Sequence, residues 1–172
     1  MKTNHIQYLL AVSLLLLQFS CGNKPKSELD AGINDSINAK YRDNPALQKI
    51  NAEILDNPSV DSLYRKRAAI YAKLKDFELA IGDAQRAWRL DTMNAQNYLT
   101  LTDMYYASNQ TRLAKETLER CLKNLPKDKD AHLKYAELLF YVKKYQESLE
   151  HINKALEIDP YMAKGYFLKG MN

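Results

Sequence analysis

Residues 95–128 read AQNYLTLTDMYYASNQTRLAKETLERCLKNLPKD, which is two apolar-periodic segments of helical length separated by a short polar turn. The same pattern occurs before and after this stretch. When Ala80, Ala114 and Ser148 are aligned, the chain repeats every 34 residues without an insertion, and the copies are 61–94, 95–128 and 129–162. The sequence therefore predicts an all-α fold of three stacked helix–turn–helix units.

Two sets of repeated positions indicate how these units pack. Large side chains recur late in the first helix of each copy, as Tyr71, Tyr105 and Leu139, and we expect them to fill the layer between successive units. Small side chains recur where the two helices of a unit approach each other most closely. These are Ala68 and Ala80, Thr102 and Ala114, and Ala136 and Ser148.

The period and the helix–turn–helix pattern resemble those of the tetratricopeptide repeat, over residues 61–162. The resemblance implies a right-handed superhelical solenoid. Arg67, Ala84 and Thr92 depart from the family's pattern, since Leu, a larger residue and Pro usually stand there, so the first copy is the most divergent. Pro126 and Pro160 end two of the copies, because a residue without an N–H does not continue a helix.

The segments on either side of the repeats are predicted to cover the ends of the stack. Asn44 precedes residues 45–60 as a helix cap and Pro45 stands in the first turn, so we expect a capping helix over residues 45–60. Residues 163–172, AKGYFLKGMN, start a fourth first helix without its partner. We expect the chain to be a fragment of a longer array, and the alternative is that this short helix is a minimal cap.

The N-terminal residues indicate export. Residues 1–20 contain Lys2 and the apolar run LLAVSLLLL, which is too short to span a bilayer and is typical of a signal peptide. Ser20 and Cys21 resemble the lipobox of bacterial lipoproteins, although Gln18 and Phe19 depart from it. We expect lipidation at Cys21, a flexible tether over residues 21–44, and a location at the outer membrane or periplasmic face of a bacterial envelope. The alternative is a plain secretory signal.

Composition and motifs argue against several functions. The formal net charge is +4, from 25 basic and 21 acidic residues interleaved along the chain, so we expect no nucleic-acid partner. No closely spaced ligand set predicts a metal, and we expect no cofactor. His132 and Cys121 are a conceivable nucleophile pair, but both stand at packing positions, where a satisfied histidine and a buried cysteine are expected. The chain is predicted not to be an enzyme.

The resemblance implies a concave face, built by the first helices, that binds segments of partner proteins. Helical spacing places nine candidate residues on it: Arg65, Lys73, Leu99, Asp103, Tyr106, Leu133, Glu137, Phe140 and Tyr141. The aromatic members are expected to anchor apolar side chains, and the alternative is that they only pack across the groove. Ala69, Thr100 and Asp130 stand where some family members bind a carboxylate-terminated tail, so that activity is not expected.

These patterns lead to one functional hypothesis and two alternatives. The hypothesis is a non-catalytic scaffold, anchored to a membrane by its N-terminal lipid, that docks a protein or peptide partner in the groove. The first alternative is a structural array that self-associates or assembles through its ends. The second is the N-terminal part of a longer protein whose activity lies beyond residue 172.

Overall fold

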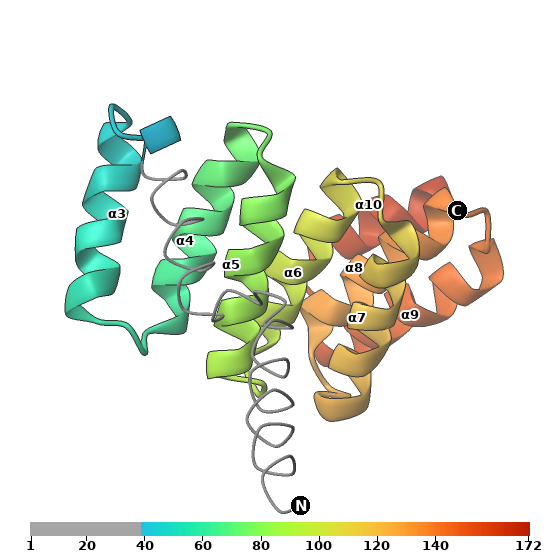
Figure 1. Cartoon of the computed structure of the whole chain (residues 1–172). Helices are drawn as coiled ribbons and strands as arrows, with labels where there is room; N and C mark the ends of the chain where they lie inside the picture. Colours follow the sequence, from blue (N-terminus) through green and yellow to red (C-terminus); the bar gives the residue numbers. More distant parts are fainter. Residues whose placement is uncertain (1–38) are drawn as a thin grey trace, which may run out of the picture. The chain divides into compact units, whose positions relative to one another are not determined.

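The computed structural model describes residues 39–172, and the predicted signal segment, Cys21 and the tether up to residue 38 lie outside this range. Contacts divide the chain into two units, Met1–Arg42 and Asp43–Asn172, and every helix named below belongs to the second. Over the described residues the structure contains helices and no strands (Figure 1). The helices are α3 (Pro45–Asp56), α4 (Asp61–Lys73), α5 (Phe77–Leu90), α6 (Ala95–Ala107), α7 (Thr111–Asn124), α8 (Lys129–Tyr141), α9 (Tyr145–Ile158) and α10 (Ala163–Met171).

The helices follow the predicted period residue by residue. The first helices α4, α6 and α8 begin at residues 61, 95 and 129, and the second helices α5, α7 and α9 begin at 77, 111 and 145. Each helix packs against the next one in the chain, and the first helices of neighbouring units also contact each other. The prediction of an all-α solenoid is therefore confirmed.

The capping helix α3 starts as predicted. The Asn44 side chain accepts a hydrogen bond from the backbone N–H of Leu47 at 3.1 Å, and Pro45 occupies the first turn, where its missing N–H costs nothing. Leu47, Ile50 and Ile54 form the buried stripe of this helix, which packs on α4. The stripe covers apolar surface that would otherwise face water at the start of the stack.

The turn inside each unit has the same hydrogen-bonding pattern three times. In the first, Lys75 adopts a left-handed backbone with φ of 60°, its N–H donates to the carbonyl of Ala72, and the next N–H, of Asp76, donates to the carbonyl of Tyr71. This is a Schellman motif, which satisfies carbonyl groups left free at the helix end. Asn109 and Lys143 repeat the conformation with φ of 62° each.

Replacing Lys143 with glycine is expected to stabilise the array by about 0.5 kcal/mol. The left-handed conformation costs a side chain such as lysine about 1 kcal/mol, and the greater freedom of glycine in the unfolded chain takes part of that gain back. Asn109→Gly is the matched control and should change stability less, because asparagine tolerates this conformation. Urea unfolding followed by circular dichroism measures both, and a destabilised Lys143→Gly protein contradicts the prediction.

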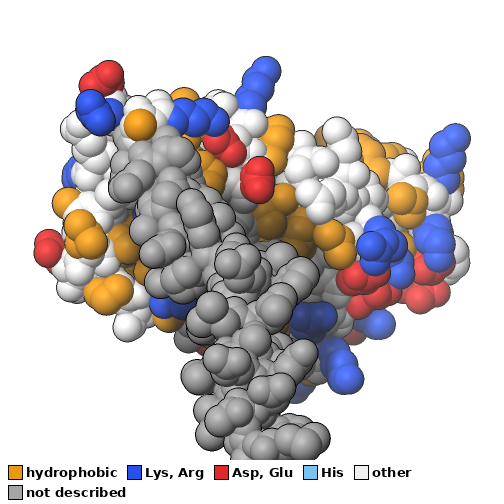
Figure 2. Space-filling model, viewed as in Figure 1, with side chains coloured by type: hydrophobic (Ala, Val, Ile, Leu, Met, Phe, Trp, Pro, Cys, Tyr) orange, Lys and Arg blue, Asp and Glu red, His pale blue; other side chains and the backbone are white. Residues whose placement is uncertain are grey.

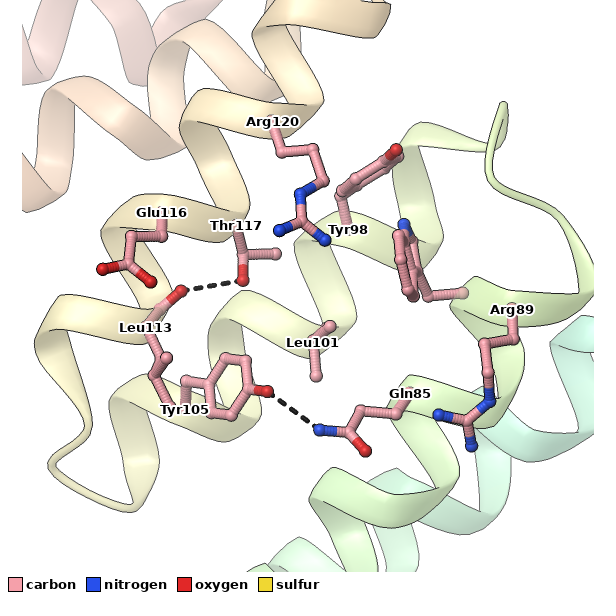
Figure 3. Close-up of a pocket in the computed structure, with 10 residues that line it drawn as sticks. Gln85, Arg89, Tyr98, Leu101, Tyr105, Leu113, Glu116, Thr117 and Arg120 are labelled. Carbon is pink, nitrogen blue, oxygen red and sulfur yellow. Dashed lines mark hydrogen bonds between the residues drawn. The ribbon is translucent and has the colours of Figure 1, made fainter.

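The predicted packing positions are also confirmed. The inter-unit residues Tyr71, Tyr105 and Leu139 are buried, with exposed fractions of 5%, 9% and 0%. Tyr105 keeps its hydroxyl satisfied, since it accepts a hydrogen bond from Gln85 Nε2 at 2.9 Å (Figure 3). The small residues of all three helix pairs are buried as well: Ala68, Ala80, Thr102, Ala114, Ala136 and Ser148. Close helix approach therefore depends on these side chains staying small.

The last helix, α10, covers the third unit with one face. Leu168 is 3% exposed and joins the core cluster that contains Leu133 and Ile152. A β-carbon on Gly165 would lie 2.8 Å from Leu156 Cδ2, so glycine allows the helix to approach closely there. The other face of α10 presents an exposed Phe167 to solvent.

Candidate functional site

The face formed by α6, α8 and α10 contains two adjoining hollows, which together we call the groove. The larger has a volume of about 410 Å³ and is lined by α6, α8 and the start of α10, and the smaller, of about 170 Å³, lies between α6 and α8. Asp103 and Lys134 line both, so the two hollows form one continuous surface. Six of the predicted groove residues line it: Leu99, Asp103, Tyr106, Leu133, Glu137 and Tyr141.

Four of the five charged side chains that line the groove, all except Asp130, are paired with one another. Lys134 Nζ lies 2.7 Å from Asp103 Oδ1 and 3.9 Å from Glu137 Oε2, and Lys164 Nζ lies 2.6 Å from Glu137 Oε1. These partly exposed pairs contribute little to stability, but each reduces the net field at the surface. Elsewhere on the protein, Figure 2 shows basic and acidic side chains interleaved on the face in view. The groove is therefore not a strongly ionic site.

Aromatic rings flank the smaller hollow. Tyr106 and Tyr141 lie with ring centroids 5.9 Å apart, and 44% and 66% of their respective surfaces are exposed. Phe140 differs, because it is partly buried against the third-unit core and contacts the ring of Tyr145 at 5.6 Å. Tyr106 and Tyr141 are thus available to a partner, whereas Phe140 mainly packs. Contact of these rings with a partner stays a prediction.

The smaller hollow also contains an unsatisfied polar group. Thr102 lines it and is 2% exposed, and its hydroxyl oxygen makes no hydrogen bond within the described part of the chain. Buried hydroxyl groups are nearly always hydrogen-bonded, so this one is suited to pairing with a group that enters the hollow. The repeat pattern predicts for Thr102 only a role as a small packing residue.

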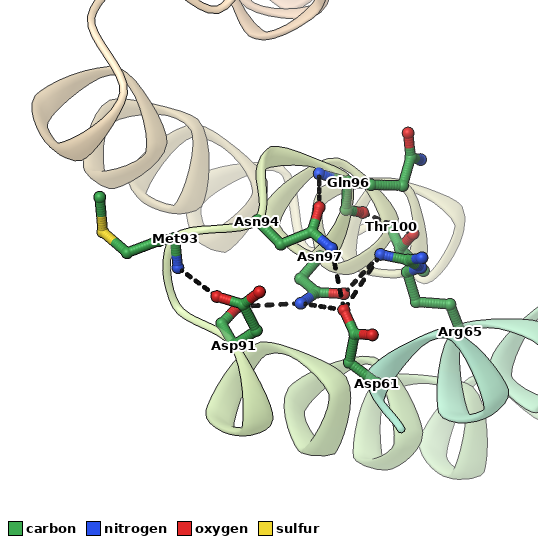
Figure 4. Close-up of polar contacts among 8 residues, drawn as sticks. All are labelled: Asp61, Arg65, Asp91, Met93, Asn94, Gln96, Asn97 and Thr100. Atoms are coloured by element: carbon green, nitrogen blue, oxygen red, sulfur yellow. Dashed lines mark hydrogen bonds and ion pairs between the residues drawn. The ribbon is translucent and has the colours of Figure 1, made fainter. Parts of the chain in front are cut away.

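The structure does not bring Arg65 or Lys73 into either hollow. Arg65 Nη1 lies 2.9 Å from Asn97 Oδ1 and 3.3 Å from Asp61 Oδ2, in a polar network that connects the first and second units (Figure 4). Asn97 is fully buried, and its amide donates to Asp61 and to the carbonyl of Asp91. Arg65 is therefore held by the protein itself, and Lys73, the other basic residue predicted for the groove, is exposed and lies outside both hollows.

The thiol and imidazole groups take packing positions, as expected. Cys121 is fully buried, and burial, with a smaller effect of Asp128, raises the pKa of its thiol to about 12, so it is a poor nucleophile. His132 is 6% exposed, with Nε2 3.0 Å from the carbonyl oxygen of Pro126 and Nδ1 3.0 Å from Nδ1 of His151. Over residues 39–172, no three His, Cys, Asp or Glu side chains are grouped to hold a metal ion. Within that same range, no helix has the length and apolar character needed to cross a membrane.

Comparison of the chain with known families and proteins gives matches that each cover part of it. The family model described as anaphase-promoting complex, cyclosome, subunit 3 matches residues 73–155. Serine/threonine-protein phosphatase 5 of Rattus norvegicus is 33% identical over 120 residues, which is 70% of this chain and 24% of the phosphatase. The chain spans about a quarter of the length of the curated relatives it matches, so the likeness concerns one part of them.

Solved structures agree on the fold. The protein TTC0263, a thermophilic tetratricopeptide-repeat protein of Thermus thermophilus, is 20% identical, with a TM-score of 0.65 over 74% of this chain and 71% of that one. YrrB, whose structure is described as having an unusual peptide-binding site, is also 20% identical, with a TM-score of 0.57 over 71% of this chain and 63% of that one.

The fold thus defines a helical-repeat solenoid protein, a class that is typically non-catalytic. The matching period, turn geometry and structural neighbours specify the repeat, and the chain has the fold of a tetratricopeptide-repeat protein.

Proposed function

We propose that this protein is a scaffold that docks an extended segment of a partner protein in the groove. The observation that carries the proposal is the smaller hollow, where two exposed tyrosines flank apolar walls and the buried Thr102 hydroxyl has no partner within the described residues. Peptide binding by the fold neighbour YrrB supports the same interpretation.

The chemistry of this hollow favours one apolar side chain of the partner as the anchor. Tyr106 and Tyr141 are large, rigid surface aromatics, and residues of this kind often contribute about 2 kcal/mol or more to binding. Leu118 and Leu138 supply apolar surface behind them. A polar group next to the inserted side chain would pair with the Thr102 hydroxyl. The smaller hollow therefore best fits a partner segment in extended conformation, with an apolar side chain and a free backbone carbonyl or amide beside it.

Removing both tyrosines is expected to weaken peptide binding at least tenfold. The test is to select peptides that bind the full chain from a random library, and then to measure their affinity for the Tyr106→Ala/Tyr141→Ala protein by calorimetry. Tyr161→Ala is the matched control, because Tyr161 is 93% exposed and lies outside both hollows. Equal affinity of all three proteins would place binding elsewhere and reject the groove.

The proposed place of action is a bacterial cell envelope, with the array anchored by lipid on Cys21. Its support is the sequence alone: an apolar run followed directly by a serine and a cysteine, then a polar segment suited to a tether. A lipid would hold the array at a membrane and raise its local concentration for partners there.

Replacing Cys21 with serine is expected to move the protein from the membrane fraction to the soluble fraction of an expressing bacterium. The mass of the membrane-extracted protein should correspond to a chain that begins at Cys21 and carries acyl groups. Cys121→Ser is the control, since that thiol is buried and should not affect anchoring. A mature mass that still includes residues 1–20 contradicts the proposal.

A further inference from the structure

Successive helices of the array enclose three equivalent seams. We define a seam as the space bounded by one helix and by both helices of the unit that follows. The first seam lies among α3, α4 and α5, the second among α5, α6 and α7, and the third among α7, α8 and α9. Since the units repeat every 34 residues, each position in one seam has an equivalent in the others.

In two of the three seams, side chains from different helices interact with one another. In the first, Arg67 Nε and Nη2 each lie 2.7 Å from an oxygen of Asp83, and Nη1 lies 2.8 Å from Asn51 Oδ1. In the third, the equivalents of Arg67 and Asp83 are Tyr135 and His151, and their rings pack edge to face with centroids 4.7 Å apart. A salt bridge in the first seam and a pair of rings in the third thus occupy equivalent positions.

The second seam is hollow. The equivalent positions there are Leu101 and Thr117, which provide neither a ring nor an ion pair, and the Thr117 hydroxyl bonds to the carbonyl of Leu113 on its own helix. A cavity of about 250 Å³ remains (Figure 3). This is room for several water molecules or one small organic molecule. The cavity is lined by Gln85, Trp88, Arg89, Tyr98, Leu101, Tyr105, Leu113, Glu116, Thr117 and Arg120.

The two arginines that line this cavity, Arg89 and Arg120, have no acidic partner among residues 39–172. The Arg120 guanidinium extends from α7 to the Trp88 ring on α5, 5.4 Å from its centroid, and Arg89 lines the cavity from α5. Within the described residues neither arginine makes a hydrogen bond or an ion pair. The one acid in the lining, Glu116, already binds Arg112 at 2.7 Å. The indole N–H of Trp88 is buried and also lacks a partner among residues 39–172.

We propose that the second seam is a binding site for a small carboxylate carried on a flat apolar body. The planar guanidinium group of Arg120, which lies over the Trp88 ring, matches a carboxylate in shape and charge, and arginine is preferred over lysine for that reason. Arg89 adds a second positive charge to the lining from α5. The rings of Trp88 and Tyr105 and the side chain of Leu101 supply the apolar walls. No residue of this lining belongs to either hollow of the groove, so the site is separate from the proposed docking function.

The chain provides its own reporter, because Trp88 is its single tryptophan. Titrating the full chain with phenylacetate should shift the indole N–H resonance saturably and change the tryptophan fluorescence. Phenylacetamide is the matched neutral probe and should bind at least tenfold more weakly. A short peptide ending in phenylalanine, with a free or an amidated C-terminus, distinguishes a free acid from a protein C-terminus as the source of the carboxylate.

Variants link the signal to the seam. Arg89→Gln/Arg120→Gln should weaken phenylacetate binding about tenfold or more. Lys123→Gln should not, since it makes the same kind of charge change on α7 outside the lining. Leu101→Tyr, which imitates Tyr135 in the third seam, should fill the cavity and abolish binding. The proposal is overturned if phenylacetate gives no saturable shift, if phenylacetamide binds equally well, or if the double variant binds like the unmodified protein.

Discussion

Replacing Arg67 with leucine is expected to lower the free energy of unfolding by about 3 kcal/mol. The change leaves the Asp83 carboxylate, which is 7% exposed, without its bidentate partner, and an unpaired buried charge is more costly than the pair is favourable. Burial already raises the pKa of Asp83 despite the opposing effect of Arg67. In Arg67→Leu this carboxyl should therefore take up a proton more readily, and the loss of stability should diminish as the pH falls below neutral.

The control for this prediction comes from the neighbouring unit. The double variant Arg67→Leu/Asp83→Thr reproduces the Leu101 and Thr117 pair of the second unit, and should restore stability to within about 1 kcal/mol of the unmodified protein. Urea unfolding of the three full chains at pH 7, followed by circular dichroism, measures this. If the single variant loses less than about 1 kcal/mol, or if the double variant is no more stable than the single one, the ion pair does not have the role assigned to it.

The helices, their turns and their packing layers could be predicted because local patterns determine them. Asn44, whose side chain caps the helix, and Pro45, which has no N–H, together indicate the start of α3. The two residues are adjacent in the chain, so the signal can be read from the sequence alone. Small residues such as Ala80 recur at each helix crossing, because any larger side chain would separate the helices.

The polar contents of the seams could not be predicted in the same way, because they depend on pairs from different helices. Arg67 was visible as a departure from the repeat, but its partner Asp83 lies 16 positions away, on α5. Arg65 does lie on a first helix, yet Asn97 in the next unit engages it. One signal was present: Asn97 is the polar member of a repeated position that holds Leu63 and Ala131 in the other units.

The contact between His132 and His151 has a defined proton arrangement. The carbonyl of Pro126 can only accept, so His132 carries its hydrogen on Nε2. When both rings are neutral, Nδ1 of His132 then accepts a hydrogen bond from Nδ1–H of His151. Burial, the neighbouring His132 and Lys154 together lower the pKa of His151 to about 4, against a weaker opposing effect of Glu147.

Acid is therefore expected to destabilise the array through His151. The unfolded chain, with a histidine pKa of about 6.5, binds a proton before the folded protein does, so stability falls as the pH decreases from about 6.5 to about 4. Allowing for the partial exposure of His151, the loss between about pH 7.5 and pH 4.5 should be about 2 kcal/mol.

Replacing His151 with glutamine should remove most of this loss, because the glutamine amide can still donate to His132 Nδ1 but does not titrate. The measurement is urea unfolding of both proteins at several pH values between about 7.5 and 4.5. Carboxylates that titrate in the same range affect both proteins and cancel in the difference. A difference that stays constant across this range would show that the folded protein protonates His151 as readily as the unfolded chain, and would contradict the lowered pKa of His151 on which the prediction depends.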